Sequence, residues 1–284
     1  RLMEASPDDR KRKRLMWISI GVNLGLLGYF KYANFFVDNI NGLLKASGSS
    51  EISWLTVALP LGISFYTFET ITYVMDVYRR VHKPLVKFSD YRLYILFFPK
   101  MIAGPIVRYH EIADQLRERH ATVDDFLHGF YRFTIGLVKK VMIADLLAPM
   151  ISGYFRLNVN AFDVPTAWLI SIAFVFQVYY DFSAYSDMAI GISRMLGFRL
   201  PENFNHPFTS GSITEFWQRW HISLGNWMRN YLYIPLGGNR GSKKRMYFNL
   251  IFVFFISGLW HGATWSFIIF GLIHGFFLLL ERLF

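Results

Sequence analysis

The chain has 284 residues, of which 53% are hydrophobic and 19% aromatic, and 18% are charged, against roughly 25% charged in a typical soluble domain. The formal net charge is +10, and residues 246–280 contain no Asp, Glu, Lys or Arg. Because about 18 consecutive apolar residues already indicate a membrane helix, this composition excludes a soluble enzyme, a disordered tail and a collagen-like fibre, and it predicts an all-α polytopic membrane protein.

The basic residues lie between apolar segments rather than on one face. In membrane proteins that distribution reflects topology and contact with anionic lipid headgroups, so membrane lipids are expected as partners and nucleic acid is not. The absence of cysteine excludes disulfides, thiolate nucleophiles and cysteine-based metal sites. We predict no bound cofactor and no metal. Because the sequence starts at Arg1 and stops soon after its last apolar run, we expect it to be a fragment of a longer chain.

The first predicted membrane helix covers residues 15–30 and follows the basic residues 10–14, which the positive-inside rule places in the cytoplasm. Residues 33–53 are nearly neutral, as expected of an outside loop. A second predicted span, residues 54–78, returns to the basic residues 79–87. Both basic clusters are therefore expected on the cytoplasmic side.

Residues 91–107 are apolar but contain Pro99 and Pro105, and proline breaks a helix. Backbone groups freed in this way need protein or water partners inside a membrane, so a re-entrant segment facing the protein interior is predicted. Residues 126–154 and 165–198 are further membrane stretches.

Three ionisable residues interrupt the stretch 165–198, namely Asp181, Asp187 and Arg194. Ionisable groups within a membrane segment are expected to have a role or a partner. They could form a proton or ion path, or an internal network of ion pairs and hydrogen bonds. The spacing suits both alternatives.

Residues 201–245 are predicted to form an interfacial loop that carries an amphipathic helix at 212–231. Ser212 and Glu215 have the spacing of a capping box, and apolar residues follow at steps of three and four. His221 lies at the flank of the apolar stripe. It could be a headgroup-level histidine of an interfacial helix, or it could turn toward the protein interior.

The uncharged run 246–280 would be about 52 Å long as one straight helix, well beyond a hydrocarbon core of about 30 Å. It is expected to break near Gly258 and Gly262, which bracket His261. An ionisable residue inside a membrane is a functional-site hypothesis by default. The alternative is a neutral histidine that is hydrogen-bonded in a helix crossing, and for His274 we favour that structural interpretation.

Five sequence blocks that include these residues occur in a fixed order along the chain. They are residues 59–68 with 76–79, residues 98–106, residues 181–189, residues 198–204 with 217–238, and the block Leu259-Trp260-His261-Gly262-Ala263-Thr264-Trp265. In their order and in their amino-acid sequence they resemble the membrane-bound O-acyltransferase family, in particular its alginate-acetylating branch, over about residues 55–281. The whole chain, residues 1–284, is accordingly expected to be a single transmembrane domain of that family.

The resemblance implies tilted transmembrane and re-entrant helices around a central funnel that holds the catalytic histidine. His261 matches that histidine, and His221 matches the family's second, Asn-or-His position. Four further residues are expected to line the substrate channel: Trp260, Trp265, Asn226 and Asp181.

The reaction implied by the resemblance passes an acyl group, most simply acetyl, from acetyl-CoA or an acyl carrier in the cytoplasm toward an extracytoplasmic polysaccharide such as alginate. A separate extracytoplasmic acetyltransferase would complete the transfer, and the protein would lie in the bacterial cytoplasmic (inner) membrane as a multi-pass enzyme. His261 would be the general base, because an imidazole accepts protons near neutral pH, and His221 would orient the reacting groups. The alternative is a transporter or an export component of exopolysaccharide secretion without covalent acyl chemistry.

Overall fold

The computed structural model describes residues 2–156 and 163–283, and in these residues the regular secondary structure is helical, apart from one isolated bridge between Phe204 and Trp220. The all-α prediction is therefore confirmed. The α-helices are α1 (Leu2–Ala5), α2 (Asp9–Leu27), α3 (Ala33–Ala46), α4 (Ile63–Tyr78), α5 (Phe88–Leu96), α6 (Tyr109–Ile112), α7 (Val123–Lys139), α8 (Asp145–Phe155), α9 (Val164–Met195), α10 (Ile213–Arg219), α11 (Ile222–Trp227), α12 (Lys243–His261) and α13 (Trp265–Leu283). The π-helical turns are η1 (Gly28–Tyr32), η3 (Lys140–Ala144) and η6 (Met228–Tyr233), and the 3₁₀ turns are η2 (Phe98–Lys100) and η5 (Pro207–Thr209).

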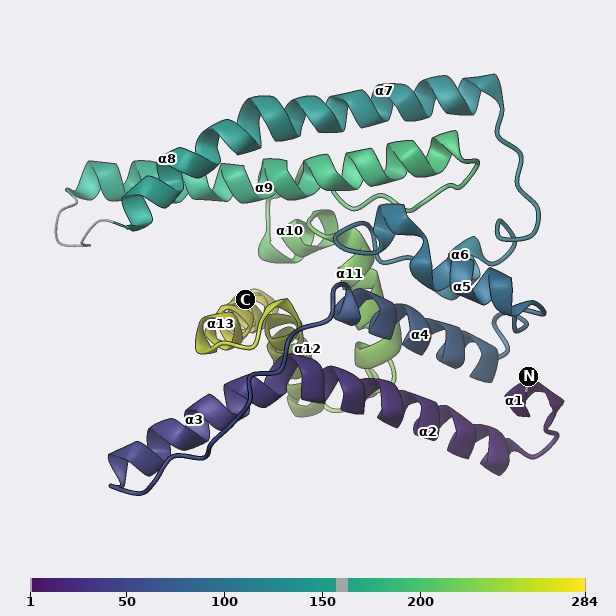
Figure 1. Cartoon of the computed structure of the whole chain (residues 1–284), viewed down its shortest axis with the longest axis horizontal. Helices are drawn as coiled ribbons and strands as arrows, with labels where there is room; N and C mark the ends of the chain where they lie inside the picture. The colour runs from purple at the N-terminus through teal and green to yellow at the C-terminus, as the bar shows by residue number, and fades with distance from the viewer. Residues whose placement is uncertain (1, 157–162, 284) are drawn as a thin grey trace.

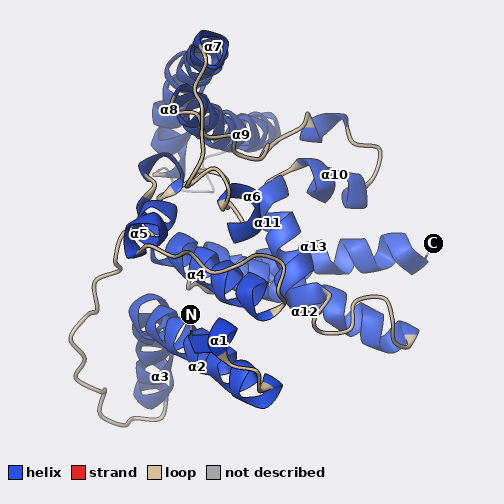
Figure 2. Cartoon of the chain, turned by 90° about the vertical axis from the view of Figure 1, so that its right-hand side faces the viewer, coloured by secondary structure: helices blue, strands red, loops and turns tan. Residues whose placement is uncertain are grey.

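The helices are arranged in three groups (Figure 1). Helices α7, α8 and α9 lie along one edge of the molecule, and α2 and α3 lie along the opposite edge. Helices α4 and α10 to α13 fill the space between these two edges, as the view at right angles also shows (Figure 2). The two candidate histidines belong to this middle group.

The N-terminal helix differs from the prediction. Residues 33–53 were expected to be a loop, but the helix passes through η1 into α3 and ends only at Ala46. Lys31, which follows the predicted end at residue 30, donates to Ser64 Oγ and to the Trp260 carbonyl oxygen, so its ammonium has partners within the protein. The second expected span is helical only over α4, because Pro60 interrupts it and Gly62 adopts a left-handed conformation with φ of 74°.

Helices α7 and α9 form a close pair joined by charged side chains. A Cβ atom on Gly129 would lie 2.6 Å from the Gly191 carbonyl oxygen, so the two backbones approach as closely as glycine permits. The ionisable residues of α9 are paired, which favours the ion-pair network over an ion path. The pairs are Asp187 with Arg132 (2.8 Å) and Lys139 (2.6 Å), Asp181 with Lys140 (2.7 Å), and Arg194 with Asp125 (3.2 Å).

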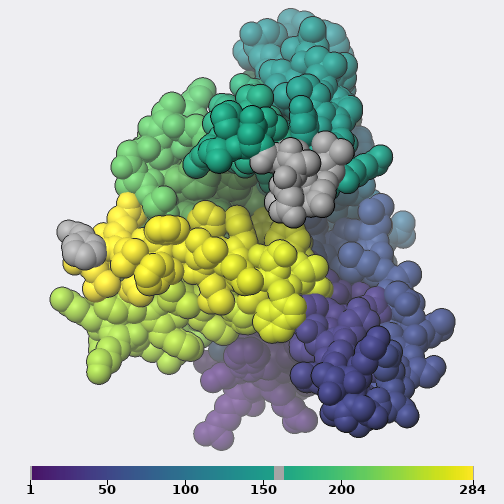
Figure 3. Space-filling view, turned by 90° about the vertical axis from the view of Figure 1, so that its left-hand side faces the viewer, coloured from purple at the N-terminus to yellow at the C-terminus, as the bar shows by residue number. Residues whose placement is uncertain are grey.

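Two of the described helices, α9 and α13, are long and apolar enough to cross a membrane. The space-filling view shows α13, in yellow, exposed across the middle of one face (Figure 3). Its exposed side chains include Ile269, Ile273 and Phe276. A large exposed apolar surface of this kind is typical of contact with lipid.

The uncharged run breaks where the sequence predicted. Helix α12 ends at His261, and α13 begins at Trp265. The two helices then cross at Gly258 and Gly271: a Cβ atom on Gly258 would lie 2.3 Å from the Phe267 carbonyl oxygen. Only glycine allows this distance, and the crossing lies one turn before His261.

Candidate active site

The predicted helix 212–231 is interrupted at His221. Helix α10 ends at Arg219 and α11 begins at Ile222, with His221 in a left-handed conformation (φ 46°, ψ 53°). A non-glycine residue with positive φ costs roughly 1–3 kcal/mol and persists only where its surroundings impose it. Ser212 caps α10 as predicted, accepting from the Glu215 amide at 3.0 Å, but the Glu215 carboxylate accepts from the Gly211 amide at 2.7 Å and not from the Ser212 amide, so the capping box is only half formed.

The break at His221 is held by a neighbouring loop. The Asn205 amide donates to the Arg219 carbonyl at 2.9 Å, and the Ile222 amide donates to the Asn203 carbonyl at 2.9 Å. These two bonds bracket His221 on both sides. The backbone conformation of His221 is therefore imposed by hydrogen bonds with residues 203–205, which lie outside the predicted helix 212–231.

His221 is buried, with 2% of its surface exposed, so the interpretation as a headgroup-level interfacial histidine is wrong. Its ring centroid lies 4.7 Å from that of Phe182 and 5.7 Å from that of Trp260. Neither imidazole nitrogen has a hydrogen-bond partner among the described residues. Leaving a buried polar group unpaired costs about 1–3 kcal/mol, so these nitrogens are available to a water molecule or a substrate.

His261 stands at the C-terminal end of α12, and its ring centroid lies 6.4 Å from that of His221. The ring of Trp260 lies beside both imidazoles, 4.9 Å from His261. Phe267 and Phe270 of α13 lie at 6.1 Å and 6.0 Å from His261. Two histidines from separate elements thus meet in an aromatic enclosure.

The structure brings two of the four predicted channel residues to this place. Trp260 is buried with an unpartnered indole nitrogen, and Asn226 lines the same cavity as His221. The other two have different neighbours: the Trp265 indole donates to Asn39 at 2.8 Å, and Asp181 pairs with Lys140. His274, for which we favoured a structural role, packs against Trp217 at 4.9 Å between ring centroids.

A cavity of about 440 Å³ extends from His221 between α10–α11 and α12–α13. This volume lies in the range of small-molecule sites, about 300–1,000 Å³. Its exposed part carries two guanidinium groups, Arg229 and Arg282, and much of its wall is apolar. The apolar lining residues include Leu224, Met228, Leu250, Val253, Phe254 and Leu278.

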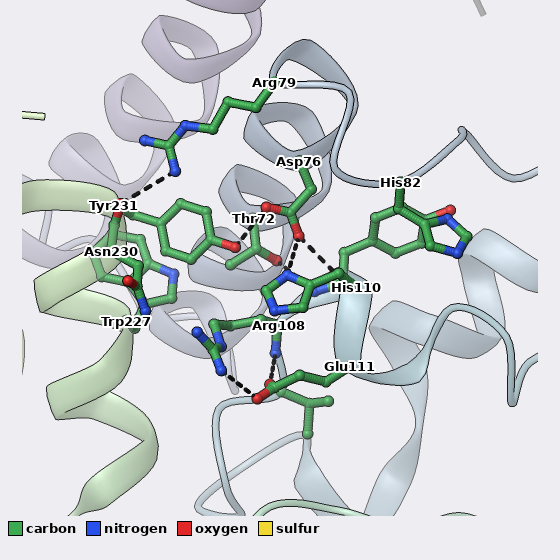
Figure 4. A network of polar contacts seen from close by, with 12 residues as sticks. Thr72, Asp76, Arg79, His82, Arg108, His110, Glu111, Trp227, Asn230 and Tyr231 are labelled. Carbon is green, nitrogen blue, oxygen red and sulfur yellow. Dashed lines mark hydrogen bonds and ion pairs between the residues drawn. The ribbon is translucent and has the colours of Figure 1, made fainter. Parts of the chain in front are cut away.

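A polar network that the sequence analysis missed lies beyond the enclosure (Figure 4). Buried Asp76 accepts hydrogen bonds from the Tyr231 hydroxyl at 2.7 Å and from His110 Nδ1 at 2.8 Å. It ties α4, α6 and η6 together. The Arg79 guanidinium, from the same end of α4, donates to the Asn230 carbonyl at 3.2 Å. Asp76 and Arg79 were part of a recognised sequence block, but nothing in that block indicated the partners.

An aromatic stack connects this network with the histidines. Trp227 stacks on Phe68 with ring centroids 3.7 Å apart, and Phe68 lies 5.6 Å from Trp260. At its other end Trp227 lies 5.6 Å from Tyr231. The stack is buried and fixes Trp260, and through it the wall of the enclosure, against α4.

The chain has relatives among known proteins. Residues 13–284 match the membrane-bound O-acyltransferase family. The chain is 48% identical over 277 residues to a protein named probable alginate O-acetylase AlgI from Azotobacter vinelandii, covering 96% of this chain and 55% of the relative. It is 49% identical over 276 residues to the protein of the same name from Pseudomonas aeruginosa, covering 96% and 52%. It is 39% identical over 311 residues to the peptidoglycan O-acetyltransferase of Helicobacter pylori, covering 99% and 58%. The chain therefore spans about half the length of the relatives it matches.

Proposed function

The chain belongs to the membrane-bound O-acyltransferase family, and we propose that it is a membrane O-acyltransferase that passes an acyl group from a cytoplasmic thioester across the membrane toward an extracytoplasmic polysaccharide. We propose acetyl as the acyl group, because two relatives are named as an alginate O-acetylase and a peptidoglycan O-acetyltransferase. The observation that carries this proposal is that the His261 ring lies near the ring of His221, and that both nitrogens of His221 are buried without a hydrogen-bond partner among the described residues.

His261 is the proposed general base. It removes the proton from the acceptor hydroxyl while the hydroxyl oxygen attacks the thioester carbonyl carbon, so that a C–O bond forms and the C–S bond breaks. The proton then passes to the leaving thiolate. A positioned base of this kind contributes about 10²–10⁴-fold to a rate. His221 faces the same space and hydrogen-bonds the acyl carbonyl or the acceptor.

The cavity next to His221 suits the thioester donor. Acetyl-CoA and phosphopantetheine carriers combine anionic phosphates with a slender arm. Arg229 and Arg282 offer two cations at the exposed part, and the apolar wall leads to His221. Guanidinium groups bind phosphate with paired hydrogen bonds.

The position of Arg229 supports donor access from the cytoplasm. Asn230, its neighbour, accepts from Arg79, which begins the second basic cluster. The first cluster meets the same end of α4, because Arg12 donates to the Tyr78 carbonyl at 2.8 Å. Since basic clusters mark the cytoplasmic side, this part of the cavity would face the cytoplasm of a bacterial cell whose inner membrane the protein crosses several times.

The final acceptor is proposed as a hydroxyl-bearing glycan outside that membrane. The relatives' names mention alginate and peptidoglycan, and a more distant one, 31% identical over 227 residues, is a teichoic acid D-alanyltransferase from Bacillus subtilis. We propose that a separate extracytoplasmic acetyltransferase receives the group and completes its transfer. We also propose that the surrounding helices form a central funnel that holds His261.

The test is transfer of labelled acetyl from acetyl-CoA by the purified protein in lipid nanodiscs. We expect a labelled O-acetyl ester from the wild type and none from His261→Ala. The His261→Ala variant should still insert normally into the membrane. His120→Ala, at an exposed histidine, is the matched control and should keep full activity. Equal labelling by His261→Ala would refute the proposal, and glycan export without acetyl transfer would favour the transporter alternative.

A further inference from the structure

The π-helical turn η1 directs two side chains toward the end of α12. Lys31 Nζ donates to the Trp260 carbonyl oxygen and to Ser64 Oγ, the latter at 2.9 Å. The Tyr32 hydroxyl donates to the Leu259 carbonyl at 2.8 Å. A π turn inside an α-helix changes the direction of the side chains that follow, and such turns are frequent at functional sites. Both contacts reach the two residues that precede His261.

These contacts satisfy carbonyl groups that α12 cannot satisfy itself. The last carbonyls of a helix have no intrahelical donor, and α12 ends at His261 because Gly262 is extended. Within a membrane, no water is available to donate hydrogen bonds to these carbonyl groups. The Lys31 ammonium adds a positive charge at a helix C-terminus, where the helix dipole favours one. Lys31 and Tyr32 thus act as a C-cap supplied by a different helix.

Lys31 also lies over the Trp260 ring, with Nζ 5.8 Å from the ring centroid. Trp260 contacts both His221 and His261. The cap therefore contacts both the backbone and the side chain of Trp260, the residue whose ring lies beside both imidazoles.

We propose that Lys31 and Tyr32 are positioning residues that fix His261 in the geometry needed for acyl transfer. The proposal rests on the function proposed above. Neither residue has to touch the substrate: each holds the last turn of α12, and a shift of about 1 Å at a reacting group can cost about 10²-fold in rate.

The test uses Lys31→Met, which keeps an unbranched apolar stem but loses the ammonium with its charge and N–H donors, and Tyr32→Phe, which loses only the hydroxyl. We expect kcat to fall about 10–100-fold in Lys31→Met and less in Tyr32→Phe, with the KM for acetyl-CoA little changed. Lys31→Arg, which keeps donors and charge, should recover much of the loss. Lys45→Met, at an exposed lysine of α3, is the matched control.

Because both side chains hold one turn, the double variant should lose less than the product of the two single effects. A KM increase at constant kcat would mean that Lys31 binds the donor, and would overturn the proposal. A lower thermal stability with unchanged kcat for the folded protein would mean that the two contacts only stabilise the fold. That result would also overturn the proposal.

A second readout does not depend on turnover. Carbethoxylation of His261 by diethylpyrocarbonate, followed by peptide mass spectrometry, should become about fivefold faster in Lys31→Met, because a lost cap frays the turn. Modification of His120 in the same sample should stay constant. An unchanged rate at His261 would refute the positioning role even if the protein transferred no acetyl group, so the two proposals fail separately.

Discussion

Lys100 and Glu69 form an ion pair in which the side chains are 0% and 1% exposed. Lys100 belongs to the proline-broken segment predicted to face the protein interior, and Glu69 belongs to α4. The ammonium also donates to the Tyr94 carbonyl at 2.5 Å. The pair thus attaches the broken segment to the helix that carries Phe68 and the aromatic stack.

Removing one partner of this pair should be more harmful than removing both. Lys100→Met leaves a buried carboxylate alone, which destabilises by about 3–5 kcal/mol, whereas replacing both ions by apolar residues is often close to neutral. We expect the thermal unfolding temperature in detergent to fall strongly in Lys100→Met and to recover in Lys100→Met/Glu69→Leu. A double variant as unstable as the single one would contradict this expectation.

Substitutions at His221 should separate the imidazole from the backbone conformation. His221→Ala removes the ring and puts alanine at positive φ, and we expect turnover to fall about 10–10³-fold. His221→Asn should retain more activity, because asparagine keeps a hydrogen-bonding group and tolerates the left-handed region.

His221→Gly is the control for strain, since glycine adopts positive φ without cost. It should be more stable than His221→Ala, because both variants lose the buried ring but only alanine is strained, and it should be as inactive as His221→Ala in the acetyl-transfer assay. Near-normal turnover of all three variants would leave His261 as the sole histidine with a role in the chemistry.

The two arginines at the exposed part of the cavity beside His221 should control the affinity for the acyl donor. Arg229→Glu and Arg282→Glu should each raise the KM for acetyl-CoA about 10-fold with kcat little changed, because a charged hydrogen bond to phosphate is made equally in the ground and transition states. Lys45→Glu makes the same charge change away from the cavity and should leave KM unaltered. If Lys45→Glu raised KM as much, net charge rather than the cavity would explain the effect.

Topology can be tested by labelling introduced cysteines, since the chain has none. Ser49, after α3, and Ser89, in α5 beyond the second basic cluster, are both exposed. By the positive-inside rule they should react with a membrane-impermeant thiol reagent from opposite sides of spheroplasts and inverted vesicles. Reaction of both from one side would exclude the orientation on which donor access depends.

Acid should weaken the start of α7. The Asp125 carboxylate accepts hydrogen bonds from Thr122 Oγ1 at 2.9 Å and from Arg194 at 3.2 Å, and these bonds hold its pKa below the usual value. A carboxyl with a lower pKa in the folded protein adds stability above its unfolded pKa, and this stability is lost as the pH falls through the folded pKa.

The unfolding temperature of the wild type should therefore decrease, as the pH falls below about 4, more than that of Asp125→Asn, which cannot titrate. Differential scanning fluorimetry in detergent would measure both curves. Parallel curves would show that Asp125 does not contribute to the acid sensitivity.

The sequence predicted the features that depend on local composition. The break before α13 followed from the length of an uncharged run that contains Gly258 and Gly262, and the N-cap at Ser212 followed from its motif. The irregular segment between α5 and α6 followed from Pro99 and Pro105.

Features that depend on contacts between distant segments could not be predicted. A helical wheel treats 212–231 as one helix, because the bonds that break it come from residues 203–205. Lys31 looked like a helix end, since its acceptors lie on α4 and α12. The partners of Asp187 come from α7, so its spacing to Arg194 carried no information about pairing.

The crossing of α12 and α13 at Gly258 and Gly271 has a consequence for reaction fidelity. A side chain at either glycine would push α13 outward, and with it Phe267 and Phe270, the two rings that cover His261. The enclosure would then admit water, and a thioester held beside a general base would be hydrolysed instead of transferred. Backbone proximity between two helices would in this way set the ratio of useful turnover to wasted donor, without any contact between the glycines and the substrate.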